Sequence, residues 1–149
     1  MKIGVICDGI SRDLNHALTV MDEFDLEYAE LQFVGDKEVG DHSQKEIKNI
    51  KKLLSGYGKP VSCLSRHIFA GMTIANRPGD ELHIKHMDAL KRVIEMAYDV
   101  DSPLVRILTS KKEQILWGQN GAEKWNVAHG AWDTLPPLIA PAVDFAKSA

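Results

Sequence analysis

The sequence has little cysteine and no long apolar run. Its two cysteines, Cys7 and Cys63, lie far apart in apolar segments and form no CxxC motif. This excludes a disulfide-stabilised mini-domain and favours two buried, reduced thiols. No apolar stretch approaches the length of a membrane span, and the N-terminal MKIGVICDGIS lacks the features of a secretion signal. We therefore expect a cytoplasmic protein with no membrane partner.

An excess of positive charge is also missing. The chain has 18 Lys and Arg residues against 21 Asp and Glu residues, a net charge of -3, and its lysine runs are diluted by acidic and apolar residues. Nucleic-acid sites usually concentrate positive charge on one face, so we expect no nucleic acid as a partner. A small phosphorylated ligand needs only one or two cations and stays compatible with this balance.

Several nucleotide-binding and hydrolase motifs are absent as well. The chain has no GxGxxG after its first apolar segment, no P-loop, no GxSxG and no HExxH. These absences argue against the dinucleotide-binding fingerprint, the P-loop nucleotide site, the hydrolase nucleophile elbow and the zincin metal site. A length of 149 residues with 44% hydrophobic residues is typical of one folded domain.

What the sequence does contain is a regular alternation of strand-like and helix-like segments. The predicted strands cover residues 2–7, 28–34, 61–69 and 104–109, and the predicted helices cover 13–24, 43–56, 80–99 and 135–149. The clearest helix start is Ser43, which has capping-box spacing to Glu46. The order βαβαβαβα predicts an α/β fold, with a parallel sheet and helices packed outside it.

Candidate site residues lie at the carboxyl ends of the predicted strands, where parallel α/β folds bind ligands. These ends offer Asp8, Glu30, Gln32, Arg66, His67, Arg106 and Thr109. Glu30 and Gln32 share one face of the second strand, and Arg106 lies among apolar residues of the fourth. Because a buried charge needs a partner, we expect a Glu30–Arg106 pair. The pair either fills the interior only or positions substrate oxygens, and the sequence favours neither.

Histidines and tryptophans supply further candidates. His67 follows the third strand and precedes a long loop, a place that suits a ligand contact and an ordinary polar role equally. His83 and His86 lie three residues apart on the third helix, and we expect both to face solvent because no further metal ligand accompanies them. Trp117 and Trp125 either form an aromatic wall over a pocket or pack in the core.

Four segments in βα order carry a resemblance to a known family. KIGVICDGI, YAELQFVGD, PVSCLSRHIFAG and PLVRILT resemble the N-terminal half of a xylose-isomerase-like TIM barrel. The most similar group is the sugar phosphate isomerase and epimerase family, which includes keto-sugar epimerases, hydroxypyruvate isomerases and inosose dehydratases. The resemblance covers nearly the whole chain. It implies a (βα)4 half of a TIM barrel, with parallel strands and outer helices in a single domain over residues 1–149.

The resemblance also implies a function. Members of the family use a divalent metal (Mn²⁺, Mg²⁺ or Zn²⁺) and carboxylates to move a proton next to a sugar carbonyl through an enediol. Carried over to this sequence, the substrate-binding positions are Glu30, Gln32, His67 and Arg106, with Trp117 as an aromatic cover. The family's metal ligands come from strands five to eight. We therefore expect no bound metal and no turnover from these 149 residues alone.

Two alternatives stay open. A half-barrel leaves its first and fourth strands with unpaired edges, which favours association. The chain is then a non-catalytic module that self-associates into a homo-oligomer, or that binds a sugar or sugar phosphate without converting it. The same elements also suit a flavodoxin-like open sheet, which carries helices on both faces.

Overall fold

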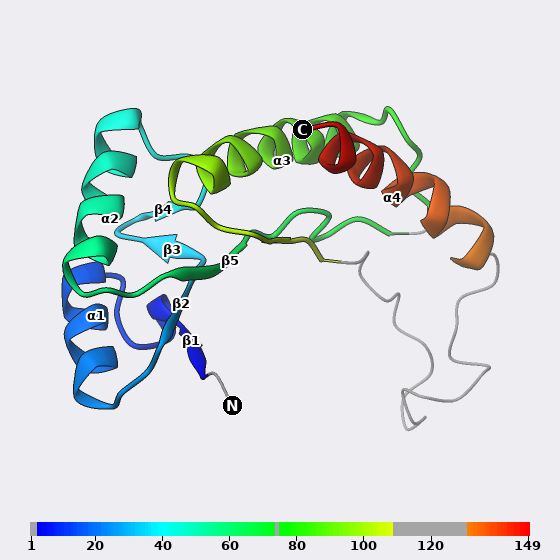
Figure 1. Cartoon of the computed structure of the whole chain (residues 1–149). Coiled ribbons are helices and arrows are strands. Elements are labelled where there is room, and N and C mark those ends of the chain that lie inside the picture. The colour runs from blue at the N-terminus through cyan, green and yellow to red at the C-terminus, as the bar shows by residue number, and fades with distance from the viewer. Residues whose placement is uncertain (1–2, 74, 109–130) are drawn as a thin grey trace, which may run out of the picture. The chain divides into compact units, whose positions relative to one another are not determined.

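The computed structural model describes residues 3–73, 75–108 and 131–149, in which strands and helices alternate along the chain (Figure 1). The strands are β1 (Gly4–Ile6), β2 (Tyr28–Leu31), β3 (Phe33–Val34), β4 (Lys37–Glu38), β5 (Val61–Ser65) and β6 (Val105–Arg106). The helices are α1 (Leu14–Glu23), α2 (Gln44–Gly56), α3 (Glu81–Asp99) and α4 (Ala131–Ser148), and a 3-10 turn, η1, covers Cys7–Gly9. All four predicted helices are present.

The main sheet orders its strands as the chain does. β1, β2, β5 and β6 lie side by side in that order, and every neighbouring pair is parallel. Crossovers between parallel strands are almost always right-handed. When each new strand is added on the same side of the sheet, right-handed crossovers therefore place all the connecting helices on one face. A flavodoxin-like sheet instead begins near its middle and winds both ways. The order confirms the α/β fold with a parallel sheet and does not fit the flavodoxin-like alternative.

The chain divides into two compact units, which are described separately. The first contains residues 3–67 and 89–107, and the second contains the described part of 68–88 and 108–149. The four parallel strands, α1 and α2 all belong to the first unit. Helix α3 contributes its C-terminal part to the first unit and its N-terminal part to the second.

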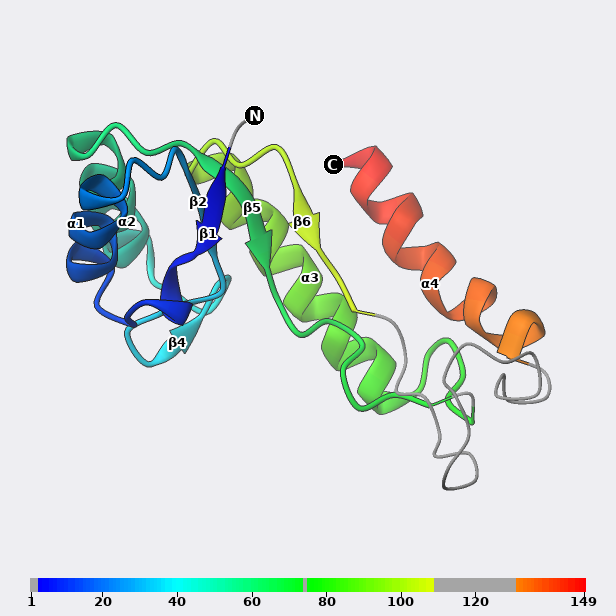
Figure 2. The same cartoon turned by 90° about the horizontal axis from the view of Figure 1, so that it is seen from below.

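In the first unit, the two faces of the sheet differ in polarity. Figures 1 and 2 both show α1 and α2 on one side of the strands. The strand residues that alternate toward the core, Ala29, Leu31 and Leu64, are 0% exposed. The helices bury Leu14, Ala17, Leu18 and Met21 from α1 and Ile47, Ile50 and Leu54 from α2. The opposite face carries Tyr28, Glu30, Cys63, Ser65 and Arg106.

The predicted strand over residues 28–34 is wrong in its second half. β2 ends at Leu31, and the following residues form an antiparallel hairpin of β3 and β4. Gly35 makes the turn with a positive φ of 62°, and its N–H donates to the carbonyl of Arg12 over 2.8 Å. The hairpin brings residues 37–41 back toward the carboxyl ends of the parallel strands. The other predicted strands are also shorter than expected.

Helix α2 begins as the sequence predicts. Ser43 Oγ accepts from the backbone N–H of Glu46 over 3.4 Å, and Glu46 Oε2 accepts from the backbone N–H of Ser43 over 2.7 Å. Lys37 donates to both carboxylate oxygens of Glu46, and these hydrogen bonds, with those from Ser43, lower the pKa of Glu46 to about 2. The capping box is confirmed.

In the second unit, the expectation that His83 faces solvent is wrong. His83 is 4% exposed and stacks on Phe69, with ring centroids 5.8 Å apart. Its Nε2 lies 3.0 Å from the carbonyl oxygen of Leu138 in α4, and its Nδ1 accepts from the N–H of Gly79. Both ring nitrogens are satisfied by backbone groups, which lets the polar ring lie in an apolar site.

Helix α4 starts four residues earlier than predicted and contains Pro136, Pro137 and Pro141. Only Leu138 and Ala142 of its described side chains are buried. Within the described ranges, none of the helices combines the length and the apolar character that crossing a membrane requires.

Gly40 provides a test of the packing in the first unit. It has a φ of +88°, and a Cβ at this position would lie 2.9 Å from the backbone nitrogen of Val93 in α3. We expect Gly40→Ala to lose about 1–2 kcal/mol from the left-handed backbone and about 1–3 kcal/mol more from overpacking. Gly58→Ala is the matched control, because Gly58 has a φ of +64° and open space around it. Urea unfolding measures both, and equal losses in the two variants would contradict the close approach.

Candidate functional site

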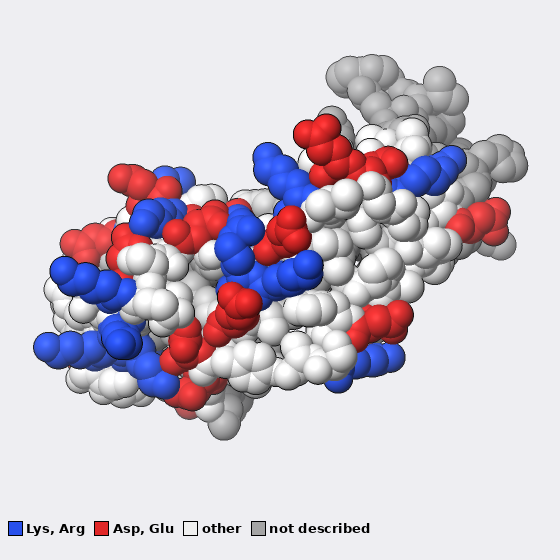
Figure 3. All heavy atoms as spheres, turned by 90° about the horizontal axis from the view of Figure 1, so that it is seen from above, with Lys and Arg blue, Asp and Glu red and all other residues white. Residues whose placement is uncertain are grey.

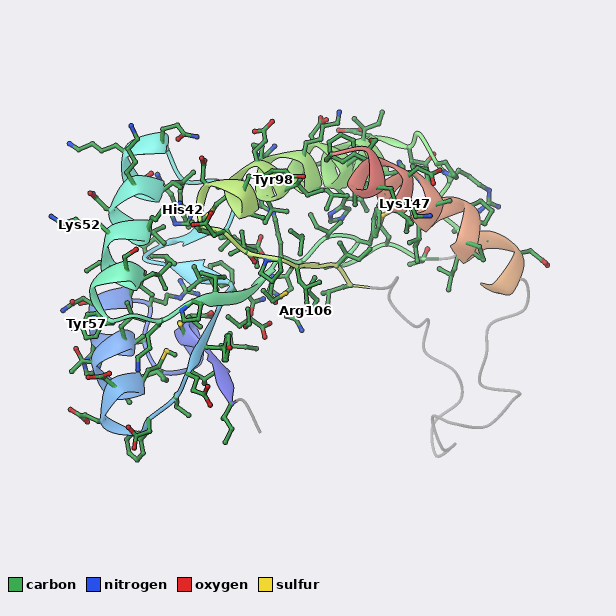
Figure 4. All side chains as sticks on the ribbon, in the orientation of Figure 1. His42, Lys52, Tyr57, Tyr98, Arg106 and Lys147 are labelled. Atoms are coloured by element: carbon green, nitrogen blue, oxygen red, sulfur yellow. The ribbon has the colours of Figure 1, made fainter. Side chains whose placement is uncertain are left out.

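The expected pair of Glu30 and Arg106 is present on the polar face of the sheet. Arg106 Nε lies 3.8 Å from Glu30 Oε1, and Ser65 Oγ donates a hydrogen bond to the same oxygen. The register explains this meeting, because Ser65 is paired with Arg106 across β5 and β6 and Glu30 with Cys63 across β2 and β5. Figure 4 labels Arg106, whose side chain extends downward from β6 in that view. Its side chain is 44% exposed and that of Glu30 is 25% exposed, so a ligand can reach both.

The two cysteines near this pair are not activated thiols. Burial, together with the charges of Asp8 and Glu30, raises the pKa of Cys7 to about 12. Burial also raises the pKa of Cys63, and the charge of Glu30 adds to that effect. Both cysteines are free, and a raised pKa favours the protonated thiol over the nucleophilic thiolate.

A second polar group, which we call the mouth cluster, lies where β2 and β5 end. It consists of Gln32, Glu38, Arg66, His67 and Asp41. His67 Nδ1 lies 2.6 Å from Glu38 Oε1, which also accepts from the backbone N–H of His67 over 2.9 Å. The amide nitrogen of Gln32 lies 3.0 Å from Nε2 and 3.3 Å from Nδ1 of the same ring.

Arg66 holds the mouth cluster together from inside the protein. Its side chain is only 9% exposed, and its guanidinium donates to the carbonyl of Val39 and, over 2.7 Å, to Asp41 Oδ2. Its Nε lies 3.6 Å from Glu38 Oε2. Arg92 of α3 donates to the second oxygen of Asp41 over 3.0 Å. A buried guanidinium needs such partners, because an unpaired buried charge is costly.

The same ion pairs set the charge state of Asp41. Its partial burial raises the pKa, but the hydrogen bonds and charges of Arg66 and Arg92 outweigh burial and hold the pKa below its ordinary value. Asp41 is therefore a carboxylate at neutral pH that fixes the connection between β4 and α2.

Phe33 connects η1, the turn that follows β1, to the mouth cluster. Its backbone N–H donates to Asp8 Oδ1 over 3.2 Å, and the Arg12 guanidinium lies 4.7 Å from the centre of its ring. The ring of His67 is tilted against Phe33 with centroids 6.1 Å apart. Asp8 thus acts through the backbone of Phe33 and helps to position the hairpin.

The sequence predicted part of this arrangement. The pair of Glu30 and Arg106 was expected and is present. The contact between Gln32 and His67 was not expected, although both residues were candidates. Trp117, together with Trp125 and Thr109, falls outside the described residues. Sequence reasoning missed Glu38, although GDKEVGD after the second strand is rich in acidic residues.

The residues that the structure describes do not fit a divalent metal site. No group of three or more His, Cys, Asp or Glu side chains converges among them. Glu38 and His67 converge but are bonded to each other, and Glu38 also faces Arg66. We therefore derive no chemical step through a metal held by these residues.

Neither a protein-family model nor a curated protein matches the sequence. The resemblance to xylose-isomerase-like barrels therefore rests on the four sequence segments and stays a proposal.

The depressed pKa of Asp41 predicts a pH dependence of stability. A carboxyl group whose folded pKa is lowered stabilises the fold fully above its ordinary pKa, about 4, and this contribution disappears as pH falls through the folded pKa. We expect Asp41→Asn to be less stable than wild type at pH 7, with the difference shrinking below about pH 4. Denaturant unfolding at a series of pH values measures it. Asp36→Asn, which changes an exposed acid in the turn between β3 and β4, is the control, and a difference that stays constant down to about pH 3 would contradict the ion pairs of Asp41.

Proposed function

We propose that this chain forms four consecutive βα units of a TIM barrel, as the N-terminal half of a xylose-isomerase-like protein does. Three observations support the proposal: the strands follow one another in chain order, all are parallel, and α1 and α2 lie on one side of them. A barrel needs this arrangement, because its helices form the outer ring and its interior is lined by the other face of the strands. In such a barrel, Glu30, Ser65 and Arg106 point inward.

The ligand class that suits these groups is a sugar or sugar phosphate. A carboxylate accepts hydrogen bonds from hydroxyl groups, and a guanidinium donates to hydroxyl, carbonyl or phosphate oxygens. Glu30 and Arg106 therefore recognise neighbouring oxygens of one ligand, and Ser65 orients the carboxylate. Gln32 and His67 contact the ligand from the mouth of the sheet, where the active sites of TIM barrels lie.

The reaction of the whole protein is then an isomerisation or epimerisation of a keto sugar. A divalent metal supplies the polarisation of the carbonyl in the family that this chain resembles, and the ligands of that metal lie on later strands. The part assigned to the present residues is binding: Arg106 holds a substrate oxygen in place, and Glu30 holds the adjacent hydroxyl.

The charge distribution fits a small ligand better than a nucleic acid. On the face seen in Figure 3, Lys and Arg side chains are interspersed with Asp and Glu side chains. Arg66 of the mouth cluster, Arg92 of α3 and Arg106 of the polar face each contact a carboxylate. A phosphate backbone is bound by a continuous positive surface instead.

A second candidate function is a self-associating, non-catalytic half-barrel. Ile3, just before β1, is 47% exposed, and Leu104, just before β6, is 62% exposed. β1 and β6 are the two outer strands of the described sheet. Apolar side chains beside open strand edges favour pairing with a second copy.

Sugar binding tests the proposed function. We expect the 149-residue chain to bind D-fructose, D-xylulose or D-fructose 6-phosphate without added metal. Calorimetry, or the NMR shifts of Ser65 and Arg106, measures this binding. Glu30→Gln and Arg106→Gln should each weaken binding about tenfold, since a hydrogen bond to a charged group contributes about 1.5–3 kcal/mol.

Lys51→Gln is the matched control, because it breaks an ion pair with Asp101 on the surface at 2.7 Å. It should leave the affinity unchanged. Binding of none of the three sugars, or unchanged binding in both Glu30 and Arg106 variants, would contradict the proposal. Light scattering of the same samples distinguishes the second candidate, which requires a dimer or larger assembly without any sugar.

A further inference from the structure

A cavity in the first unit lies apart from the proposed sugar site. Its volume is about 300 Å³, which is enough for a small organic molecule. Its lining comes from the start of α1, from the turn between β3 and β4, and from the segment that leads into and includes the first part of α2. Among the described residues, this lining shares no member with the polar face or the mouth cluster.

Arg12 supplies a positive charge to this cavity. One face of its guanidinium lies against Phe33, with 4.7 Å between the guanidinium carbon and the centre of the ring. In the described part of the chain, no carboxylate pairs with Arg12, whereas the arginines of the mouth cluster, α3 and the polar face each contact one. A guanidinium presents its N–H donors in a planar fork that matches a carboxylate, so Arg12 is suited to a carboxylate of a ligand.

The two acidic residues that line the cavity already have partners. Asp13 Oδ1 accepts from two backbone N–H groups in the first turn of α1, over 3.0 Å and 3.4 Å. Lys37 donates to both carboxylate oxygens of Glu46 over 2.8 Å. A negatively charged ligand is therefore attracted by Arg12 and meets no unpaired carboxylate in this lining.

Asn15 and His42 add polar groups to the lining. Asn15 Oδ1 accepts from the hydroxyl of Tyr57 over 3.2 Å, which leaves the amide N–H groups of Asn15 without a partner in the described chain. His42, labelled in Figure 4, donates from Nε2 to the carbonyl of Val34 over 3.1 Å. Its Nδ1 is buried and, among the described residues, has no hydrogen-bond partner. A buried acceptor without a partner is costly, so this ring favours a ligand that brings a hydrogen-bond donor.

The rest of the lining is aliphatic. Leu14, Val34, Ile50 and Leu53 all contribute to it. These residues favour a hydrocarbon group on the ligand, because removing apolar surface from water is favourable.

We propose that this cavity binds a 2-hydroxy carboxylic acid with an aliphatic side chain. The carboxylate lies against Arg12 and accepts from the amide of Asn15, the 2-hydroxyl donates to His42 Nδ1, and the side chain packs on the aliphatic residues. The proposal goes beyond the proposed function and does not depend on it, because the two sites share no residue.

Three small acids test the ligand class. They are 2-hydroxy-4-methylpentanoate (both enantiomers), 4-methylpentanoate and glycolate, each titrated into the 149-residue chain by calorimetry. We expect saturable binding of one enantiomer of the first acid, with NMR shifts of the Asn15 side-chain amide. 4-Methylpentanoate lacks the hydroxyl and should bind about fivefold more weakly, as expected for one neutral hydrogen bond. Glycolate lacks the tail and should bind more than about tenfold more weakly, because each buried methylene favours binding about fourfold.

Variants of Arg12 locate the charge. Arg12→Gln should weaken binding of 2-hydroxy-4-methylpentanoate about tenfold or more, because the carboxylate loses a charged donor. Arg12→Lys keeps the charge without the fork and should lie between the two. Lys52→Gln is the matched control, because it removes the same charge from an exposed residue of α2 outside this lining, and it should leave the affinity unchanged. Urea unfolding checks the fold of each variant, and Arg12→Lys decides if Arg12→Gln is unfolded.

His42→Gln tests the hydroxyl contact. Its amide N–H can still donate to the carbonyl of Val34, but the Nδ1 acceptor is gone. We expect 4-methylpentanoate to bind as in wild type and the preference for the hydroxy acid to disappear. No saturable binding of either enantiomer, wild-type affinity in both Arg12 variants, glycolate binding as tightly as 2-hydroxy-4-methylpentanoate, or an unchanged hydroxyl preference in His42→Gln would each overturn the proposal.

Discussion

The buried guanidinium of Arg66 is the interaction on which the rest of the first unit depends. A charge that is 9% exposed must be compensated inside the protein. Its partners are the carbonyl of Val39 and the carboxylates of Asp41 and Glu38, all from the segment between β2 and α2. Because Arg66 directly follows β5, these contacts fasten that segment to the end of a central strand. Arg92 extends the same network to α3 through Asp41.

The candidate site follows from this fastening. With residues 38–41 held in place, Glu38 meets the side chain and the backbone of His67 at the carboxyl end of β5. On the polar face of the sheet, the parallel register brings Glu30, Ser65 and Arg106 together. The contacts on the polar face result from strand pairing, whereas those of the mouth cluster are made by the segment between β2 and α2. Both suit a ligand rich in oxygen atoms, which is the basis of the proposed sugar function.

The sequence predicts what depends on local periodicity. The alternation of Ala29 and Leu31 with Tyr28 and Glu30 gives the two faces of β2, and apolar segments with capping signals give the helices. The meeting of Glu30 and Arg106 was predictable because a charge among apolar strand residues needs an opposite charge nearby. Glu38 was not, because its partner is 29 residues away and because the predicted strand over residues 28–34 ends before β4, which carries Glu38. His83 was missed for a related reason: its partners are backbone groups, which leave no mark in the sequence.

We infer that Arg66, through Glu38, orients the ring of His67 toward a ligand. Long-range ¹H–¹⁵N NMR spectra show which ring nitrogen of His67 carries the proton. They are recorded at neutral pH for wild type and for Arg66→Lys. The account predicts the Nδ1–H tautomer in wild type, and a shift toward a mixture in Arg66→Lys, because a lysine ammonium lacks the planar fork that reaches all three acceptors. An Nε2–H tautomer in wild type, or the same tautomer in both proteins, would contradict it.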